Sequence, residues 1–404
     1  MRFLQISDLR AGADPESEKS WGRQRAAEIR DGLKRAADLA SAEGCDLLLV
    51  AGGLFCHQPV TSELAEVNRL FLAYPGLQVV IAAGAVDPLR RNAPARSFKW
   101  APNVHFAGRD GLERFYFPGI GTSVYAASCG ENGAVPLSEL VREYRESYEA
   151  EERAAVKLLL LPELLPETKT KINAGAQAAQ SLPGACPAME RQAAEQTDSR
   201  TQTAVHQAAV PDTALSLQAL LEPFSYAAVG GGAQHAELLQ GKAYCAGTAE
   251  PLSMQETGEH GVYIGDISSV TGRLIDISFR ATAAASYVPL LVNVTEQTGA
   301  GELEALLRSE MDQRGKQNIY RLRIAGRRSP ETVFDLKPLF QEYRIAELLD
   351  ETVPQYDLSA LFAEHPQDMI GFYISSLQRE ADERSSIEEK AMYYGIDALL
   401  KTAK

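Results

Sequence analysis

The sequence predicts a layered α/β protein of two domains that ends in a helical tail. Over the first 125 residues, short apolar runs alternate with polar segments of helical period. A smaller alternation of the same kind begins near residue 281, and 404 residues exceed what one hydrophobic core usually supports. Because the apolar runs have hardly any polar positions, we expect strands that are buried on both faces, as in parallel sheets.

The first domain is predicted to span residues 1–280. Its expected strands are 2–7, 46–51, 78–83, 122–128, 157–161, 225–229, 242–246, 262–266 and 274–280, and its expected helices are 26–42 and 62–74. Residues 168–211 are rich in Ala, Gln, Thr and Pro, a composition that buries too little apolar surface to order itself. We therefore predict a long flexible loop there.

The second domain is predicted to be a smaller α/β unit over residues 281–362. It contains an expected strand at 288–294, a helix at 302–314 and a strand at 319–326. Residues 363–404 have apolar residues at helical spacing without strong turn signals. They predict a helical tail with an apolar face for a partner.

Composition limits the possible functions. A net charge of −14 and a pI near 5.1 argue against a chain that holds DNA by itself, because phosphate neutralisation needs clustered Lys and Arg. The five cysteines are spaced singly and do not suit zinc. There is no long apolar run and no secretory signal pattern at the start, so we expect a cytoplasmic protein without a membrane span.

Five stretches, in this order and spacing, carry a resemblance to a known family. They are SDLRAG at 7–12, AGGLFCHQPVT at 51–61, AAGAVD at 82–87, LLLLPE at 158–163 and YAAVGGGAQ at 226–234. The chain resembles the SbcD-type and YhaO-type DNA-repair exonucleases of the calcineurin-like metallophosphoesterase superfamily. The resemblance implies a four-layer α/β/β/α sandwich, a smaller capping domain and a two-metal site at the strand ends.

The residues that the family uses as ligands are mostly replaced in this chain. In its first stretch the family has an Asp and, two residues later, a His; this chain has Asp8 and Arg10 at these positions. In the second stretch, the family's metal-bridging Asp is replaced by Gly53. The vestigial site comprises Asp8, Arg10, Gly53, Ala85, Val86, Asp87, Pro162, Gly231 and Ala233. Only Asp8 and Asp87 keep a polar function, which leaves no ligand shell for a hard or borderline cation.

The sequence therefore predicts no catalytic residue, no metal and no cofactor, with manganese as the metal if the site were active after all. We hypothesise that the Arg10 guanidinium stands in for the metals as an internal ion pair with Asp8 and Asp87. The alternative is an active phosphodiesterase or nuclease with relocated ligands, namely Asp8, Asp87, His57 and His235. The two histidines lack a carboxylate or second histidine at ligand spacing, which favours solvated loop residues.

A second alternative is a nucleic-acid-binding module. Arg321 and Arg323 alternate with apolar residues and so share one strand face, and Arg327 and Arg328 follow. A solvated outer face explains the same pattern. Residues 62–74 cover the region where the family dimerises, although an ordinary amphipathic helix has the same spacing.

The resemblance continues to the end of the chain. Residues 345–362 and 393–400 are most similar to the YhaO branch, whose C-terminal helices are expected to engage an SbcC-like or YhaN-like coiled-coil ATPase. The expectation is a pseudo-nuclease that serves as scaffold or regulatory subunit with that ATPase in DNA repair. It would reach DNA through the complex and could form a homodimer.

Overall fold

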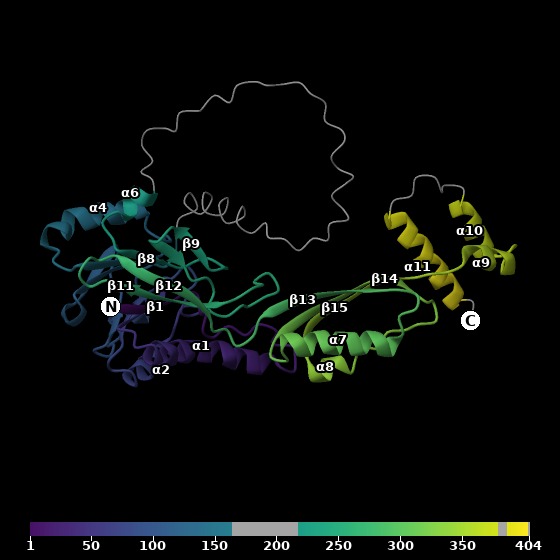
Figure 1. The fold of residues 1–404 in the computed structure, drawn as a ribbon, viewed down its shortest axis with the longest axis horizontal. Helices are drawn as coiled ribbons and strands as arrows, with labels where there is room; N and C mark the ends of the chain where they lie inside the picture. The colour runs from purple at the N-terminus through teal and green to yellow at the C-terminus, as the bar shows by residue number, and fades with distance from the viewer. Residues whose placement is uncertain (164–216, 379–385, 403–404) are drawn as a thin grey trace, which may run out of the picture. The chain divides into compact units, whose positions relative to one another are not determined.

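The computed structural model describes residues 1–163, 217–378 and 386–402 (Figure 1). The predicted loop at 168–211 lies outside the described residues. The chain forms two compact units. The first unit comprises Met1–Gly12, Arg30–Ala249 and His260–Thr282, and the second comprises Ala13–Ile29, Glu250–Glu259 and Ala283–Lys404. The division thus falls within helix α1 (Gly22–Ala42), and a short segment before residue 260 also belongs to the second unit.

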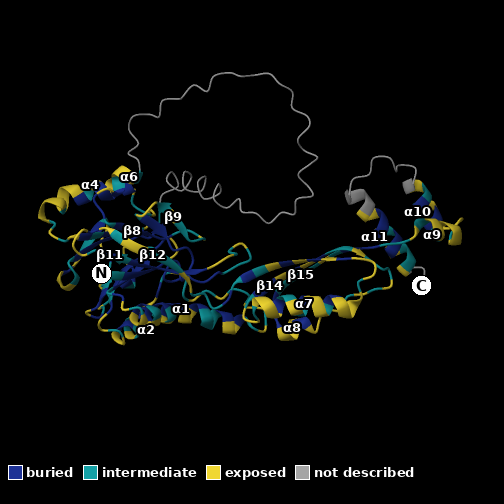
Figure 2. Cartoon of the chain, viewed as in Figure 1, coloured by how far each residue is buried: buried dark blue, intermediate teal, exposed yellow. Residues whose placement is uncertain are grey.

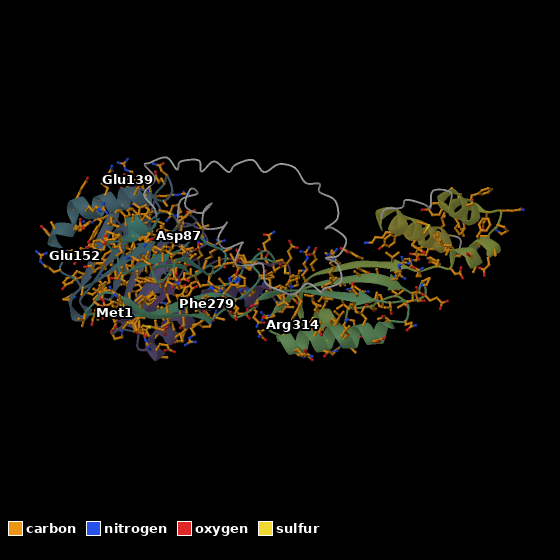
Figure 3. All side chains as sticks on the ribbon, turned by 45° about the horizontal axis from the view of Figure 1, so that its top comes forward. Met1, Asp87, Glu139, Glu152, Phe279 and Arg314 are labelled. Atoms are coloured by element: carbon orange, nitrogen blue, oxygen red, sulfur yellow. The ribbon has the colours of Figure 1, made fainter. Side chains whose placement is uncertain are left out.

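Two six-stranded sheets form the centre of the first unit. One has the order β12-β11-β1-β2-β3-β4. Strands β1 to β4 run parallel to one another, β11 runs antiparallel to β1, and β12 runs antiparallel to β11. Its strands are β1 (Arg2–Ile6), β2 (Leu47–Ala51), β3 (Gln78–Ala82), β4 (Val104–Phe106), β11 (Gly261–Ile267) and β12 (Leu274–Ala281). The amino group of Met1, a residue labelled in Figure 3, donates to the Ile267 carbonyl at 3.0 Å and so extends the β1–β11 contact.

The other sheet has the order β5-β6-β7-β8-β10-β9. Its central strands β6, β7, β8 and β10 are parallel, and both edge strands are antiparallel. The strands are β5 (Leu112–Phe117), β6 (Thr122–Ala127), β7 (Val156–Leu161), β8 (Tyr226–Val229), β9 (Ala236–Leu239) and β10 (Ala243–Cys245).

Three apolar cores hold four layers together. The core between the sheets contains the alternate side chains of both, among them Leu49 and Leu158. A second core packs α1 and α2 (Thr61–Leu72) on the first sheet, and a third packs α4 (Leu137–Ser147) and α6 (Leu217–Leu221) on the other. Buried residues accordingly follow the strands (Figure 2). The predicted α/β/β/α sandwich is confirmed.

A buried glutamine links the two sheets. Gln5 of β1 is fully buried, and its Nε2 donates to the carbonyls of Val229 at 3.1 Å and Tyr244 at 3.0 Å. Its Oε1 accepts from the Tyr226 hydroxyl at 2.5 Å. A buried amide needs all of these partners, so Gln5 fixes how β1 faces β8 and β10.

The second unit contains a parallel three-stranded sheet of order β13-β14-β15. Its strands are β13 (Tyr287–Val294), β14 (Ile319–Arg328) and β15 (Arg344–Pro354), and the helices that cover one face are α7 (Ala300–Arg314) and α8 (Leu339–Glu342). Leu303, Leu307 and Met311 of α7 are fully buried at helical spacing against the inward residues of the strands.

The described residues at the end of the chain form the helices α9 (Leu358–Glu364), α10 (Met369–Gln378) and α11 (Ser386–Thr402). A small core joins α10 and α11 to Val353 of β15 through residues such as Ile374 and Ile396. The Asp357 side chain caps α9 by accepting from the N–H groups of Ser359 and Ala360. The predicted helical tail is confirmed.

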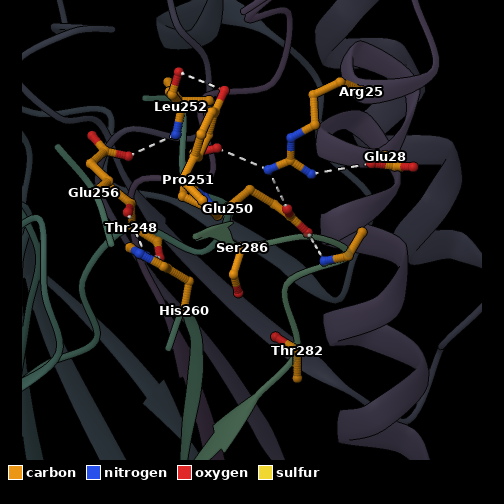
Figure 4. Close-up of polar contacts among 12 residues, drawn as sticks. Arg25, Glu28, Thr248, Glu250, Pro251, Leu252, Glu256, His260, Thr282 and Ser286 are labelled. Carbon is orange, nitrogen blue, oxygen red and sulfur yellow. Dashed lines mark hydrogen bonds and ion pairs between the residues drawn. The ribbon is translucent and has the colours of Figure 1, made fainter. Parts of the chain in front are cut away.

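A buried ion-pair cluster ties the separate segments of the second unit together (Figure 4). Arg25 of α1 has no exposed side-chain surface and lies 2.8 Å from Glu250 Oε2, while it donates to the Pro251 carbonyl at 2.9 Å. Glu28 lies 3.3 Å from Arg25 and 2.6 Å from Arg344 of β15. These contacts join three stretches that are far apart in the sequence.

Candidate functional site

The five stretches that carry the resemblance include the carboxyl ends of β1, β2, β3, β7 and β8 or the residues directly after them, as expected for a two-metal site. The structure brings these ends together. The Asp8 N–H donates to the Gly52 carbonyl at 3.0 Å, and the Arg10 N–H donates to the Gly53 carbonyl at 2.8 Å. The Gly231 N–H, which follows β8, donates to Asp8 Oδ2 at 2.7 Å. The candidate site is therefore a junction of loops from both sheets.

Asp8 is held by backbone groups in an unusual conformation. Its φ is 46°, a left-handed value that few residues other than glycine adopt, and the side chain is 4% exposed. Burial raises the pKa of Asp8 to about 7, against the opposing effects of the Gly231 N–H and the Arg10 guanidinium. The carboxylate is thus placed where its charge is unfavourable.

Asp87 is buried in the same way, at 5% exposed. Its Oδ1 accepts from the Gly84 N–H at 2.6 Å and its Oδ2 from the Phe55 N–H at 3.1 Å. Burial raises the pKa of Asp87, and these backbone hydrogen bonds oppose the rise. Both oxygens are used to fix the loops after β2 and β3, so the role of Asp87 in this structure is to position backbone.

The hypothesis that Arg10 forms an ion pair with Asp8 and Asp87 is wrong. Within the described residues Arg10 forms no ion pair with Asp8 or Asp87, and its Nε is buried without a hydrogen-bond partner. The two aspartates are satisfied by backbone N–H groups instead. The guanidinium acts on Asp8 only through its charge, by lowering the carboxyl pKa.

Glycines let the strand ends approach one another more closely than side chains would permit. A Cβ on Gly53, where φ is +58°, would overlap Asp8 Oδ1 and lie 2.9 Å from Asp8 Cα. A Cβ on Gly52 would lie 2.6 Å from Pro162 Cβ, and one on Gly84 would overlap the Gly53 nitrogen. The three glycines therefore allow close packing of the strand ends next to Asp8.

The remaining positions of the vestigial site are apolar or lack a side chain. Ala85, Val86 and Ala233 are exposed, and Pro162 is buried against Gly52. None of these side chains has a donor or acceptor atom that could bind a metal or move a proton. Among residues 1–163, 217–378 and 386–402, no group of three or more His, Cys, Asp or Glu side chains is placed to hold a metal ion. The residues that are present do not fit a two-metal centre.

His57 and His235, the histidines considered as relocated ligands, have other partners. His57 Nε2 lies 3.0 Å from Glu63 Oε1 on α2. The His235 ring stacks on Phe279 with centroids 3.8 Å apart. The described residues hold no group of three or more His, Cys, Asp or Glu side chains placed to bind a metal ion, so His235 does not complete a ligand set with Asp8 and Asp87.

Sequence reasoning missed a chain of polar contacts beside the loop junction. Cys56 Sγ lies 3.1 Å from His57 Nδ1, and His57 in turn contacts Glu63. Because a carboxylate only accepts, this contact places the His57 proton on Nε2 and leaves Nδ1 to accept from the thiol. Burial raises the pKa of Cys56, which favours the unreactive thiol. The signal available in the sequence was the Glu six residues after His57.

The arginines considered for DNA contact lie on β14, and two of them pair with carboxylates on β15. Arg321 Nε lies 2.6 Å from Glu347 Oε2, and Arg323 Nη2 lies 2.7 Å from Glu351 Oε2. These pairs are about half exposed, so each contributes little stability. They do reduce the positive potential of this sheet face.

Arg327 and Arg328, the other two arginines of the set, have neutral groups among their contacts. Arg327 Nη1 donates to Gln355 Oε1 at 2.7 Å, and its guanidinium lies over the Tyr393 ring. Arg328 Nη1 donates to the Thr332 carbonyl at 3.0 Å. DNA contact through these two residues stays a prediction.

The buried state of Asp8 predicts a specific pH dependence of stability. Because the folded-state pKa of about 7 exceeds the ordinary 3.8, the folded chain binds more protons between these values, and stability falls as pH rises through this window. The penalty approaches about 4 kcal/mol above pH 7. We expect Asp8→Asn to remove most of it, measured by urea unfolding between pH 4 and 8. Asp31 is exposed, so Asp31→Asn should leave the dependence of the unfolding free energy on pH unchanged. The prediction would be contradicted if Asp8→Asn had the same pH dependence as wild type.

Comparisons with known proteins do not assign a family. No family model matches the sequence, and no curated protein matches it. Among solved structures, the chain is similar to the crystal structure of TT1561 of Thermus thermophilus, with 12% identity and a TM-score of 0.33 over 69% of this chain and 98% of that one. In the described residues, no helix is long and apolar enough to cross a membrane. The α/β/β/α class itself rests on the strand order and the cores described above.

Proposed function

We propose that this chain is a catalytically inactive relative of the SbcD-type and YhaO-type nucleases, which serves as scaffold or regulatory subunit beside an SbcC-like or YhaN-like coiled-coil ATPase in DNA repair. The observation that supports it is the glycine-filled junction at Asp8. Two-metal hydrolysis needs oxygen and nitrogen ligands around ions roughly 3.5–4 Å apart. Here Gly53 lies so close to Asp8, and Gly52 and Gly84 lie so close to their neighbours, that a ligand side chain at any of the three positions would overlap other atoms.

An assay of phosphodiester hydrolysis tests the inactive part of the proposal. The purified chain is incubated with linear duplex DNA and excess Mn²⁺, beside an active SbcD-type enzyme, and bound manganese per chain is counted by mass spectrometry after free ion is removed. We expect no hydrolysis above that of Asp8→Asn and no stoichiometric manganese. Manganese-dependent cleavage that Asp8→Asn or His57→Ala abolishes would establish the relocated-ligand enzyme instead.

The helical tail supports the partner part of the proposal. Ile370 and Ile374 of α10 are buried in the small tail core, whereas Met369 and Phe372 are 73% and 69% exposed. Large apolar side chains at this exposure on one helix are suited to the apolar stripe of a coiled coil. The proposed occupant is accordingly the coiled-coil base of the ATPase.

Phe372→Glu should weaken the binding of a purified ATPase of this type by at least about tenfold, because an aromatic anchor is replaced by a charge that must be desolvated. Titration calorimetry measures the dissociation constant. Val270→Glu serves as the matched control, since Val270 is 84% exposed in the first unit. If Phe372→Glu and wild type bound the ATPase with equal affinity, the helical tail would not be part of the interface. If wild type did not bind, the proposed partner would be wrong.

A further inference from the structure

A cavity of the first unit opens at the amino ends of four strands. It has a volume of about 430 Å³ and is lined by residues at or just before the starts of β7, β8, β10 and β12. The candidate site instead lies at the carboxyl ends of β7 and β8, so the two sites lie at opposite ends of these strands. The size is in the range of small-molecule sites. The lining comes from segments 155–157, 222–225, 241–242 and 271–274.

Three cationic side chains from three of these segments line the cavity, namely Lys157, Lys242 and Arg273, with Glu222 as the one acidic residue among the described lining. Within the part of the chain that the structure describes, none of the three forms an ion pair with a carboxylate. The Lys242 Nζ donates to the backbone carbonyl of Glu222 at 3.2 Å. In a chain with net charge −14, three cations beside a single carboxylate form an unusual cluster.

The cluster carries an electrostatic cost in the absence of an anion. Burial lowers the pKa of Lys242, and the nearby Lys157 lowers it further, although Glu222 opposes both effects. An anion in the cavity would favour the charged form of Lys242 and so offset the effects of desolvation and repulsion. The cost identifies the sign of the charge that this cavity favours.

The walls of the cavity are fixed by close contacts. Gly272 has a φ of +66°, and a Cβ on it would overlap the Ala155 carbonyl oxygen and lie 3.1 Å from Ser225 Oγ. The turn that carries Arg273 is thus packed directly on the segment before β7. Ser225 Oγ accepts from the Lys157 N–H at 3.1 Å, which leaves the hydroxyl hydrogen to donate.

We propose that this cavity binds the phosphate group of a small phosphorylated molecule. A phosphate carries a charge of about −1.5 to −2 at pH 7 and accepts several hydrogen bonds. Arg273 supplies a planar pair of donors, and Lys157 and Lys242 supply point charges. Pro223 and Leu274 offer apolar surface to the organic part of the ligand. The inference is independent of the proposed function.

Titration calorimetry with inorganic phosphate, pyrophosphate and AMP tests the proposal in a phosphate-free buffer. We expect saturable binding of at least one probe, weakened at least about tenfold by Lys242→Gln and by Arg273→Gln and weakened by added NaCl. Lys34→Gln, an exposed lysine of α1, should bind like wild type. Without a ligand, Lys242→Gln should be as stable as wild type or more stable, because it relieves repulsion, and added probe should no longer raise its unfolding temperature.

Two results would overturn the proposal. One is the absence of saturable binding to all three probes, or an equal loss in Lys34→Gln. The other is tighter binding of a single-stranded oligonucleotide than of pyrophosphate, with the same dependence on Lys242 and Arg273, which would assign the cavity to a nucleic-acid backbone.

Discussion

Gly53→Asp, which places a carboxylate where the family resemblance would expect a bridging ligand, should destabilise the protein by about 3–5 kcal/mol and bind no manganese. The backbone at Gly53 has a φ of +58°, and a Cβ would overlap Asp8 Oδ1 and crowd Asp8 Cα. A second carboxylate would then also stand beside buried Asp8, which is unfavourable for both charges. Urea unfolding gives the stability, and mass spectrometry gives the bound metal.

Gly44→Asp is the matched control for this prediction. Gly44 has a similar φ of +67°, but a Cβ there would have no atom within 4 Å. It should lose only about 1–2 kcal/mol, from the left-handed backbone alone. If Gly53→Asp were as stable as Gly44→Asp, or if Gly53→Asp with Arg10→His bound manganese, the strand-end loops would have room for a metal site.

Arg25→Met should destabilise the second unit by about 3–5 kcal/mol, because it leaves the carboxylate of Glu250 buried without its cation. Arg25 has no exposed surface and Glu250 is 1% exposed, so water cannot replace the lost contact. The two compact units need not unfold together. Hydrogen exchange of the amides in β13, β14 and β15 therefore reports the loss directly.

The effect of Arg25→Met is compared with that of Arg308→Met in the same unit. Arg308 pairs with Glu304 and Glu342 at 35% side-chain exposure, and removing it should change stability by about 1 kcal/mol or less. Adding Glu250→Gln to Arg25→Met should recover part of the loss, since a neutral amide is buried more easily than a charge. Equal losses for Arg25→Met and Arg308→Met would show that the buried pair contributes no more than a surface pair.

The long apolar strands and the layer order could be predicted from the sequence, and several shorter elements could not. Strand β4 has only three residues, too few to show a period. The helix at Leu137–Ser147 buries Leu140, Val141 and Tyr144 at helical spacing, but so short an apolar pattern among charged residues does not by itself indicate a helix. Strand β15 was missed because its pairing shifts next to Tyr320, so that Ile345 and Leu348 face the same core at a spacing of three.

At the candidate site, the sequence predicted that Asp8 and Asp87 lie at strand ends, but it did not predict which groups contact them. The partners of Asp8 and Asp87 are backbone N–H groups, which every residue except proline carries, so no side-chain pattern announces them. The expected ion pair of Arg10 failed for this reason. Glycines in a motif indicate freedom of the backbone, and only the structure shows that Gly53 and Gly84 use it for close packing.

The position of β1 has a consequence for synthesis of the chain. This strand lies inside its sheet, between β2 and β11, and Arg2 pairs opposite Asp266. While the protein is made from its amino end, β1 can join β2 early, yet its other edge stays open until residues 261–267 have left the ribosome. A nascent chain halted before that point presents an unpaired apolar strand edge, which makes this interval the one in which chaperone protection against aggregation matters most.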